Sequence, residues 1–168
     1  EPLLNGRYPS GLGEFDEHWA EGAGIVEAGD LERIARPLAF LSINEYHPRF
    51  AIGPAELDTA RLAGFVGGEP SPFSVGLPYL DVEPPGIAHT TMGWMIEPRG
   101  LTDLLVAVAE RAPGLPLYIS ENGCTANDYR DHAGRVQDDA RIAYLDGHLR
   151  ACAAAIERGV PLQGYFLW

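Results

Sequence analysis

The stretch Leu117–Gly123, which reads LYISENG, is the part of the sequence that decides the expected fold. Pro113, Gly114 and Pro116 interrupt the chain just before a short apolar run, so a buried β-strand is favoured over a helix. A strand that is buried on both faces belongs to a parallel α/β sheet, where ligands bind at the carboxyl ends of the strands. Glu121 therefore lies at the expected functional edge, although a solvated glutamate at a strand-to-loop junction accounts for these local features equally well.

Two more strands and two helices are predicted around this stretch. Residues 38–46 form an apolar run that ends in Asn44-Glu45-Tyr46, and residues 160–168 form another, with Gly164 inside it. Apolar residues at helical spacing predict one helix before the central strand and a second helix after it. The first stripe comprises Leu101, Leu104, Leu105, Val108 and Ala112, and the second, between a capping Asp138 and Gly159, comprises Ile142, Leu145, Leu149, Cys152 and Ile156.

The alternation of strands and helices predicts a parallel sheet with helices outside it. Three strands do not close a barrel, so in an eight-stranded architecture the first and last of them would present unpaired edges. The other segments are less regular. Residues 1–29 are expected to form a loop and a short helix, Asp30 is expected to cap a short helix through Ile34, and residues 49–91 form a long Gly- and Pro-rich stretch in which an extra hairpin is one interpretation.

The composition is that of an acidic globular protein. Its 168 residues are 46% hydrophobic and 21% charged, which predicts one domain with a substantial core. Twenty-four acidic and twelve basic residues give a formal charge of -12, which opposes binding to nucleic acid or to an anionic membrane. No apolar run approaches the roughly 20 residues that span a bilayer, and the first residues lack the layout of a signal peptide. A neutral ligand fits this charge better.

The sequence predicts no cofactor and no metal site. Cys124 and Cys152 are too few for a disulfide framework, and no Cys/His cluster has zinc spacing, so both are interpreted as free thiols of a cytoplasmic protein. Neither a G-x-G-x-x-G nor a P-loop follows a strand, which disfavours a small nucleotide-binding domain. The histidines share no motif and are interpreted as surface or structural residues: His18, His47, His89, His132 and His148.

Taken together, these segments resemble a known enzyme family. LYISENG resembles the nucleophile motif of glycoside hydrolase family 1, the β-glucosidase family of (β/α)8 barrels. Residues 135–149 and 159–168 are similar to the family's last helix and eighth strand, residues 40–46 to its sixth strand, and residues 92–101 to the segment that enters its seventh helical unit. The resemblance implies that residues 1–168 are a single carboxyl-terminal portion of an α/β TIM barrel, with strands 6 to 8 near 38–46, 117–121 and 162–168.

The resemblance also implies roles for individual residues. Glu121 matches the nucleophile of a retaining β-glycosidase, and Tyr46 matches the tyrosine whose hydroxyl holds that nucleophile ionised. Asn44 would help to order the same hydrogen bonds. Trp168 resembles the platform under the sugar in subsite -1, and Trp94 resembles the tryptophan that lines the aglycone side.

The second carboxyl group that this chemistry needs is missing from the sequence. The family's acid/base glutamate lies in an Asn-Glu-Pro motif, which does not occur here. Glu45 stands where the family usually has tyrosine, and strand alternation predicts that it points away from a site that contains Asn44 and Tyr46. The expectation is therefore a β-glycosidase portion that acts on a β-linked glucoside or related sugar and is inactive as an isolated chain.

Two kinds of partner follow from the unpaired edges. The strands would pair with the missing amino-terminal barrel portion or with another copy of the chain. The alternative function is a noncatalytic partial barrel that serves as a sugar-binding or assembly module.

Overall fold

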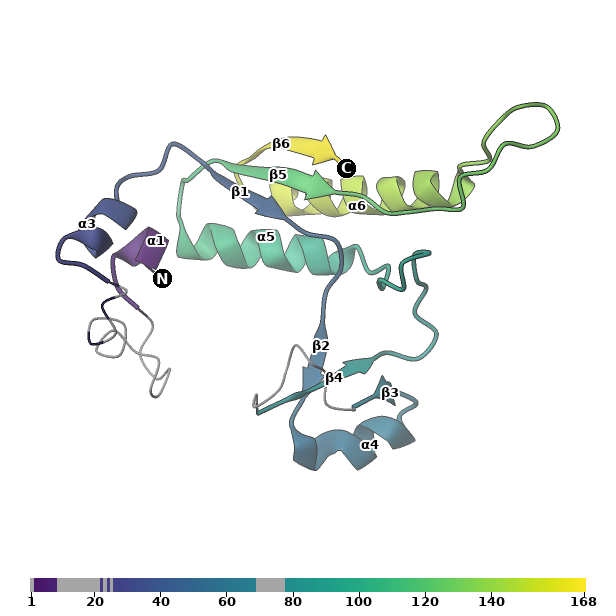
Figure 1. The fold of residues 1–168 in the computed structure, drawn as a ribbon, viewed down its shortest axis with the longest axis horizontal. Coiled ribbons are helices and arrows are strands. Elements are labelled where there is room, and N and C mark those ends of the chain that lie inside the picture. Colours follow the sequence, from purple (N-terminus) through teal and green to yellow (C-terminus); the bar gives the residue numbers. More distant parts are fainter. Residues whose placement is uncertain (1, 9–21, 23, 25, 69–77) are drawn as a thin grey trace.

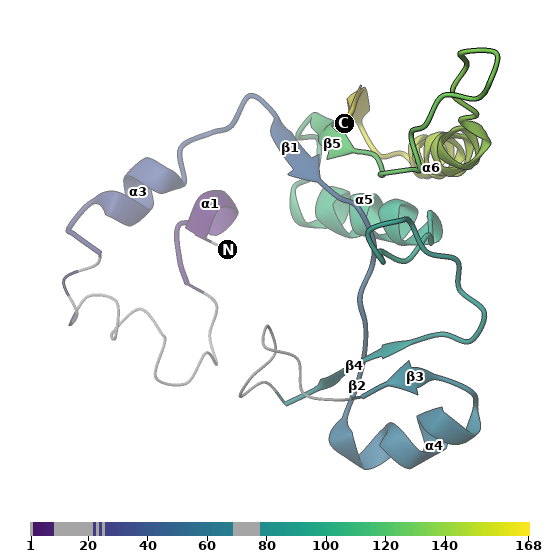
Figure 2. The same cartoon turned by 45° about the vertical axis from the view of Figure 1, so that its right-hand side comes forward.

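The computed structural model describes residues 2–8, 22, 24, 26–68 and 78–168. Near the amino terminus it contains α1 (Pro2–Asn5) and α3 (Asp30–Ile34), which lie beside each other (Figures 1 and 2). The predicted capping role of Asp30 is wrong by one residue, because Gly29 occupies the N-cap position with a φ of 86°. The Asp30 carboxylate instead accepts a hydrogen bond from the Glu27 amide at 3.0 Å. The sequence features at Pro9 and at 14–19, including His18, lie outside the described residues.

A three-stranded parallel sheet forms the centre of the fold. Its strands are β1 (Leu41–Asn44), β5 (Leu117–Asn122) and β6 (Leu162–Leu167), in the order β1-β5-β6. The predicted strands and their parallel arrangement are confirmed, with each strand slightly shorter than its apolar run. Because all three strands point the same way, their carboxyl ends meet at one edge of the sheet.

Two long helices cover one side of this sheet (Figures 1 and 2). They are α5 (Arg99–Arg111), which precedes β5, and α6 (Asp139–Glu157), which connects β5 to β6. The two helices also contact each other, and the buried Thr102 hydroxyl donates a hydrogen bond to the Ala151 carbonyl at 3.0 Å. The core between helices and sheet consists of Leu101, Leu105, Leu117, Ile119, Ala151, Cys152, Ala155 and Val160.

The predicted inner stripe of α6 is partly wrong. Ile142, Leu149 and Ile156 are exposed, whereas the buried positions of α6 are Tyr144, His148, Ala151, Cys152 and Ala155. The second half of the buried face consists of the small residues Ala151, Cys152 and Ala155, which pack in the core. Near the first half, α6 approaches its neighbours closely, since a Cβ on Gly147 would lie 2.9 Å from the Pro98 ring. Asp138 does occupy the N-cap position, but it makes no capping hydrogen bond and pairs with Arg141 instead.

The stretch over 49–91 is more regular than its composition indicated. It contains a second, antiparallel sheet in the order β2-β4-β3, formed by β2 (Phe50–Ile52), β3 (Val66–Gly67) and β4 (Leu80–Glu83). A 3-10 turn, η2 (Pro54–Glu56), and a short helix, α4 (Leu57–Leu62), lie between β2 and β3. Strands of two to four residues are too short to show a clear alternation in the sequence.

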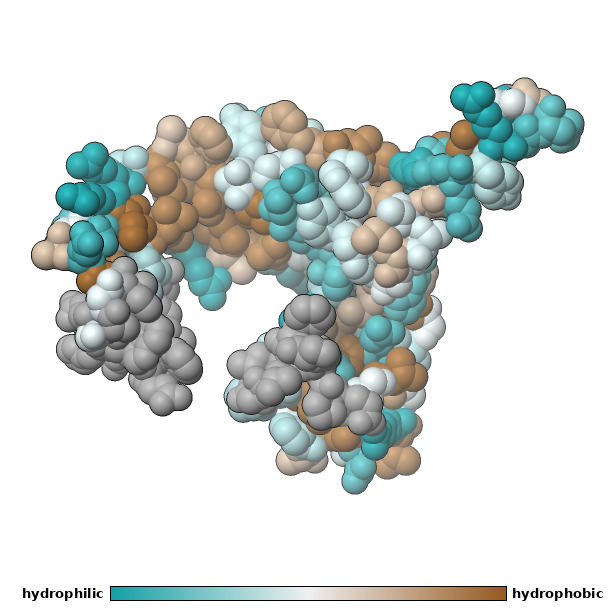
Figure 3. Space-filling view, in the orientation of Figure 1, coloured by the Kyte–Doolittle hydropathy of each residue, from teal (hydrophilic) through white to brown (hydrophobic). Residues whose placement is uncertain are grey.

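The described residues form an α/β structure with no closed barrel. In this part of the chain β1 and β6 are the edges of the parallel sheet, each paired on one side only. Figure 3 shows apolar residues gathered over β1 and α5, and hydrophilic residues on the segment that projects between β5 and α6. No helix among the described residues combines the length and apolar character needed to cross a membrane.

Candidate functional site

A tyrosine and a carboxylate meet where β1 and β5 end. The Tyr46 hydroxyl donates a hydrogen bond to the Glu121 carboxylate, although the two residues are 75 positions apart in the sequence. The main chain joins the same two segments, since the Glu45 amide donates to the Glu121 carbonyl at 3.0 Å. Two of the predicted site residues are therefore brought together at the carboxyl edge of the sheet.

An irregularity in β5 determines where Glu121 points. Ile43 is paired with Ile119, but Asn44 is paired with Glu121, so Ser120 is an extra residue relative to β1. Leu117 and Ile119 lie in the core, and strict alternation would send Glu121 to that side as well. The bulge instead leaves Glu121 half-buried on the open side with Tyr46, and places the next residue, Asn122, in the interior.

Aromatic rings surround the tyrosine. The Tyr46 ring lies 5.0 Å from the Trp94 ring and 5.6 Å from the Trp168 ring, and the two tryptophan rings are 6.2 Å apart. His47 adds a fourth ring, 5.6 Å from Trp94. Trp168 is 52% exposed, so much of its surface is free to contact a ligand. The structure thus gathers both predicted tryptophans beside the Tyr46–Glu121 pair.

Asn44 is near this pair but bonds to a different residue. Its side-chain oxygen accepts a hydrogen bond from the Ser120 hydroxyl at 2.7 Å, and its backbone is in register with Glu121. Asn44 therefore contacts Ser120, the bulge residue that directs Glu121. Its side-chain hydrogen bond is to Ser120 and not to the Glu121 carboxylate.

A buried hydrogen-bond network lies behind the site, on the side of the sheet that faces α6. Asn122 is fully buried, and its amide donates to the Glu45 carbonyl at 2.8 Å and to the Tyr144 hydroxyl at 3.2 Å. The Tyr165 hydroxyl of β6 donates to the Asn122 side-chain oxygen, and the Tyr144 hydroxyl donates to the Tyr46 carbonyl at 3.1 Å. This network ties all three strands and α6 together directly beneath the site.

Glu45 is part of this network, and it points away from the open side as strand alternation predicted. It is 8% exposed, and its carboxyl group lies 3.3 Å from the Asn122 amide nitrogen. Burial raises its pKa to about 7, because removal from water disfavours the charged form, while the hydrogen bond from Asn122 opposes the shift. Burial also raises the pKa of Tyr165 to about 12.

The sequence reasoning missed the network. Asn122 lies in the LYISENG motif, and Tyr144 and Tyr165 lie in segments that resemble the family, but nothing in the sequence pattern gives any of them a role. The one signal in the sequence is the amide side chain of Asn122 at the end of a strand expected to be buried. A buried polar group needs hydrogen-bond partners, so this residue indicates that a network surrounds it.

A close contact joins the ends of β5 and β6. A Cβ on Gly123 would lie 2.0 Å from the Trp168 carbonyl oxygen, and the Trp168 amide donates to the Asn122 carbonyl at 3.0 Å. Only glycine allows the backbone of Trp168 to lie this close. Gly123 thus sets the position of one of the site's tryptophans.

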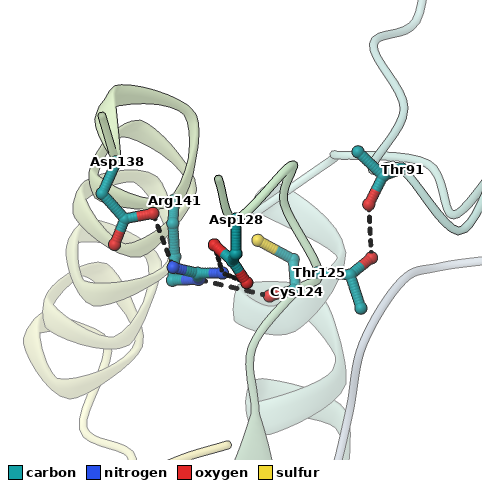
Figure 4. Close-up of polar contacts among 6 residues, drawn as sticks. All are labelled: Thr91, Cys124, Thr125, Asp128, Asp138 and Arg141. Atoms are coloured by element: carbon teal, nitrogen blue, oxygen red, sulfur yellow. Dashed lines mark hydrogen bonds and ion pairs between the residues drawn. The ribbon is translucent and has the colours of Figure 1, made fainter. Parts of the chain in front are cut away.

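Arg141 holds the segment that follows Gly123 against the start of α6 (Figure 4). Its guanidinium makes two hydrogen bonds to Asp128, at 2.8 and 2.9 Å, and one to Asp138 at 2.5 Å. Next to this cluster a pocket is lined by Thr90, Thr91, Cys124, Thr125 and Tyr129, among others. Burial raises the pKa of the Cys124 thiol, which leaves it protonated and weakly nucleophilic near neutral pH. Among the described residues, no three His, Cys, Asp or Glu side chains gather as a metal-binding cluster.

Comparison with known proteins finds relatives of one enzyme family along the whole chain. The model of glycosyl hydrolase family 1 matches residues 1–168. A bifunctional β-D-glucosidase/β-D-fucosidase from Bifidobacterium breve is 33% identical over 172 residues, which cover 100% of this chain and 36% of that protein. β-Glucosidase A from Acetivibrio thermocellus is also 33% identical, over 100% of this chain and 34% of its own length.

Solved structures agree with the sequence relatives. A family 1 β-glucosidase from Thermotoga maritima superimposes with a TM-score of 0.74 at 30% identity, over 99% of this chain and 33% of that one. The chain thus spans about a third of the length of the relatives that it matches. A family model that matches every residue from 1 to 168 leaves no segment of the sequence unassigned, and the chain belongs to glycosyl hydrolase family 1.

Proposed function

We propose that this chain supplies the nucleophile of a retaining β-glycosidase and that Glu121 is this nucleophile. The observation that carries the proposal is the hydrogen bond from Tyr46 to Glu121 at the carboxyl edge of a parallel sheet. A phenol that donates to a carboxylate favours its ionised form, and a carboxylate must be ionised to attack an anomeric carbon. Tyr46 therefore keeps Glu121 ready to react and fixes the direction of its oxygen atoms.

The surrounding rings have the character of a sugar site. Pyranose rings have an apolar face that packs against aromatic side chains, and Trp168 and Trp94 both lie beside Tyr46. We assign Trp168 to the platform beneath the sugar that is cleaved and Trp94 to the side of the leaving group. Asn44 contributes by holding the Ser120 bulge that directs Glu121.

The second carboxyl group must come from elsewhere. Retention requires an acid/base carboxyl about 5 to 5.5 Å from the nucleophile. Glu45 does not serve, because its carboxyl is buried against Asn122 on the opposite side of the sheet. We therefore propose that residues 1–168 are a carboxyl-terminal portion, with β1, β5 and β6 as strands 6 to 8, and that the acid/base belongs to the other part of the barrel.

Two features of the described residues support a missing barrel portion as the partner. The outer edges of β1 and β6 present backbone groups that are not paired within this sheet. Phe166, Leu167 and Trp168 on β6 and beyond it are all exposed. Additional strands would pair with the edges and cover these side chains. The substrate class that we propose is a β-linked glucoside or a related β-glycoside, in line with the names of the relatives.

The test is a complementation assay on an aryl β-glucoside. We expect no turnover by the chain alone, turnover when the amino-terminal portion of a family member is added, and none when the chain carries Glu121→Gln. Glu110→Gln is the matched control, since Glu110 is an exposed glutamate on α5. Turnover by the chain alone would disprove the missing acid/base, and an active Glu121→Gln mixture would disprove the nucleophile.

A second measurement identifies the nucleophile directly. An activated 2-deoxy-2-fluoro-β-glucoside is expected to add its glycosyl group to the complemented chain, and peptide mass spectrometry should find it on Glu121. Attachment at another carboxyl group would contradict the assignment. A stable oligomer of 168-residue chains that binds sugars without cleaving them would instead support the noncatalytic module.

A further inference from the structure

The backbone of Glu45 is linked to both residues of the Tyr46–Glu121 pair. Its amide donates to the carbonyl of Glu121 at 3.0 Å, and its carbonyl accepts from the Asn122 amide at 2.8 Å. The next residue is Tyr46, whose hydroxyl bonds to Glu121. A small movement of Glu45 is therefore transmitted through one covalent bond to Tyr46 and through one hydrogen bond to Glu121.

The Asn122 side chain has more acceptors around it than hydrogens to give. An amide nitrogen carries two hydrogens. Three oxygens lie within reach of this one: the Glu45 carbonyl at 2.8 Å, the Tyr144 hydroxyl at 3.2 Å and the Glu45 carboxyl at 3.3 Å. The carboxyl group and the Tyr144 hydroxyl thus compete for the second hydrogen.

The charge of Glu45 decides this competition. A neutral carboxyl is a weak acceptor and leaves the hydrogen with Tyr144, whereas a carboxylate attracts it strongly. Tyr144 in turn donates to the Tyr46 carbonyl at 3.1 Å, so a change at its hydroxyl reaches Tyr46 by a second route. The Tyr165 hydroxyl donates a hydrogen bond to the side-chain oxygen of Asn122. The amide nitrogen can therefore change its partner only by rotating while this oxygen stays in place.

The groups around Glu45 do not compensate a negative charge. On α6 its electrostatic neighbours are Tyr144 and Cys152, and on β6 Tyr165, which are neutral or negative. His148 of α6 stacks on the Tyr144 ring at 3.9 Å, and because burial lowers its pKa it is uncharged near neutral pH. Cys124, which follows β5, interacts electrostatically with Tyr144 and Tyr165 and raises the pKa of both. On the sheet side, the remaining titratable groups are Glu121 and Tyr46. The nearby Arg141 is engaged by Asp128 and Asp138.

We propose that Glu45 is a positioning residue for the Tyr46–Glu121 pair, and that release of its carboxyl proton to solvent redirects the Asn122 amide and shifts the hydrogen bond between Tyr46 and Glu121. The pair would have one geometry in mildly acidic solution and another above neutral pH, because burial raises the pKa of Glu45 to about 7. This inference concerns the geometry of the pair, and it would stand even if Glu121 were not a nucleophile.

The experiment is a pH titration of the chain by NMR, with carbon-13 labels at glutamate carboxyl groups and at the tyrosine Cζ. We expect the Glu45 signal to change with a midpoint near pH 7, and the Glu121 and Tyr46 signals to change with the same midpoint. In Glu45→Gln, which keeps the shape and the acceptor oxygen, the latter two changes should disappear. In the exposed control Glu110→Gln they should persist.

Two further variants test whether the titration seen at Tyr46 comes from Glu45. Histidines titrate in the same range and His47 packs against Trp94, so the inflection at Tyr46 must survive in His47→Gln. Tyr144→Phe removes the competing acceptor, and it should shift the Glu45 midpoint to lower pH and weaken the response at Tyr46. An ordinary midpoint for Glu45 near 4.5 in the wild-type chain would overturn the proposal, as would a response at Tyr46 that persists in Glu45→Gln.

Discussion

The Tyr46 hydroxyl and the Glu121 carboxylate are hydrogen-bonded across the carboxyl ends of neighbouring parallel strands. Each residue is positioned by its own strand: Tyr46 follows the end of β1, and Glu121 lies at the bulge in β5. The contact exists because the sheet brings together two chain segments that are 75 residues apart.

Tyr46→Phe is expected to reduce turnover in the complementation assay roughly tenfold or more, because it removes one charge-assisted hydrogen bond to the proposed nucleophile Glu121. Loss of the donor leaves the Glu121 carboxylate without this contact, so the fall should appear in kcat of the complemented enzyme. Tyr129→Phe, at an exposed tyrosine, is the control. An unchanged kcat in Tyr46→Phe would show that the hydroxyl does not act on Glu121.

Glu121→Gln should lower the pKa of Tyr46. The hydrogen bond to Glu121 and the charge of that carboxylate both raise the pKa of this phenol, and burial adds to them, so removing the charge makes ionisation easier. The measurement is the tyrosinate absorbance at alkaline pH, with Tyr46→Phe used to identify the signal. Tyr165, with a pKa of about 12, ionises at the upper end of such a titration. A Tyr46 signal that does not move would contradict the hydrogen bond.

Glu45 makes the stability of the chain depend on pH. Its pKa is 4.5 in an unfolded chain and about 7 in the folded protein, so the folded state binds the proton more tightly. The contribution of Glu45 to the free energy of unfolding is therefore fully present below about pH 4.5 and is lost as the pH rises through about 7, a change on the order of 3 kcal/mol relative to Glu45→Gln. Urea unfolding of both chains at several pH values measures this difference. A constant difference across the range would refute the buried carboxyl.

Gly123→Ala should destabilise the fold, because the new Cβ would meet the Trp168 carbonyl oxygen at 2.0 Å. We expect a loss of about 1–3 kcal/mol or more in urea unfolding, together with a change in tryptophan fluorescence as Trp168 moves. Gly53→Ala is the matched control, since its Cβ would have an ordinary contact at 3.5 Å and its φ is -68°. Equal effects of the two substitutions would argue against the close contact.

Arg141→Lys should loosen the segment between β5 and α6. A lysine cannot make the paired hydrogen bonds to Asp128 and also reach Asp138, so amide hydrogen exchange over residues 124–130 should become faster. Arg150→Lys, which alters an exposed pair with Asp146, should leave exchange there unchanged. Wild-type protection in Arg141→Lys would mean that other contacts hold the segment.

Much of the parallel sheet and its helices could be predicted, because apolar periodicity reports burial directly. The apolar run ending at Asn44 and the run Leu117–Gly123 each proved to contain a strand at nearly the expected position. The face of α6 could not be predicted, since periodicity favours large residues such as Leu149 while close helix packing favours Ala151 and Ala155. The spacing of residues does not reveal how closely two helices approach each other.

Only some residues of the candidate site could be predicted from the sequence, because the others are defined by long-range contacts. Tyr46, Trp94 and Trp168 could be chosen from their resemblance to a family pattern, and the structure places Tyr46 on Glu121 and both tryptophans beside Tyr46. The buried network could not be chosen, because Asn122, Tyr144 and Tyr165 come from three elements whose contacts are long-range. A hydrogen-bond network of this kind leaves no periodic signal in the sequence.

The extra residue in β5 gives the site an unusual sensitivity to chain length. Deletion of Ser120 would place Glu121 directly after Ile119, where regular alternation keeps its carboxylate on the open side. Insertion of one residue between Ile119 and Ser120, with the bulge kept, would instead turn this carboxylate toward the core beside Leu117 and Ile119. Every other side chain could remain chemically intact, and the carboxylate would still have moved to the wrong side of the sheet. For anyone who builds variant libraries of this chain, insertions near position 120 are thus a different kind of change from substitutions, since they decide which side of the sheet carries the carboxylate.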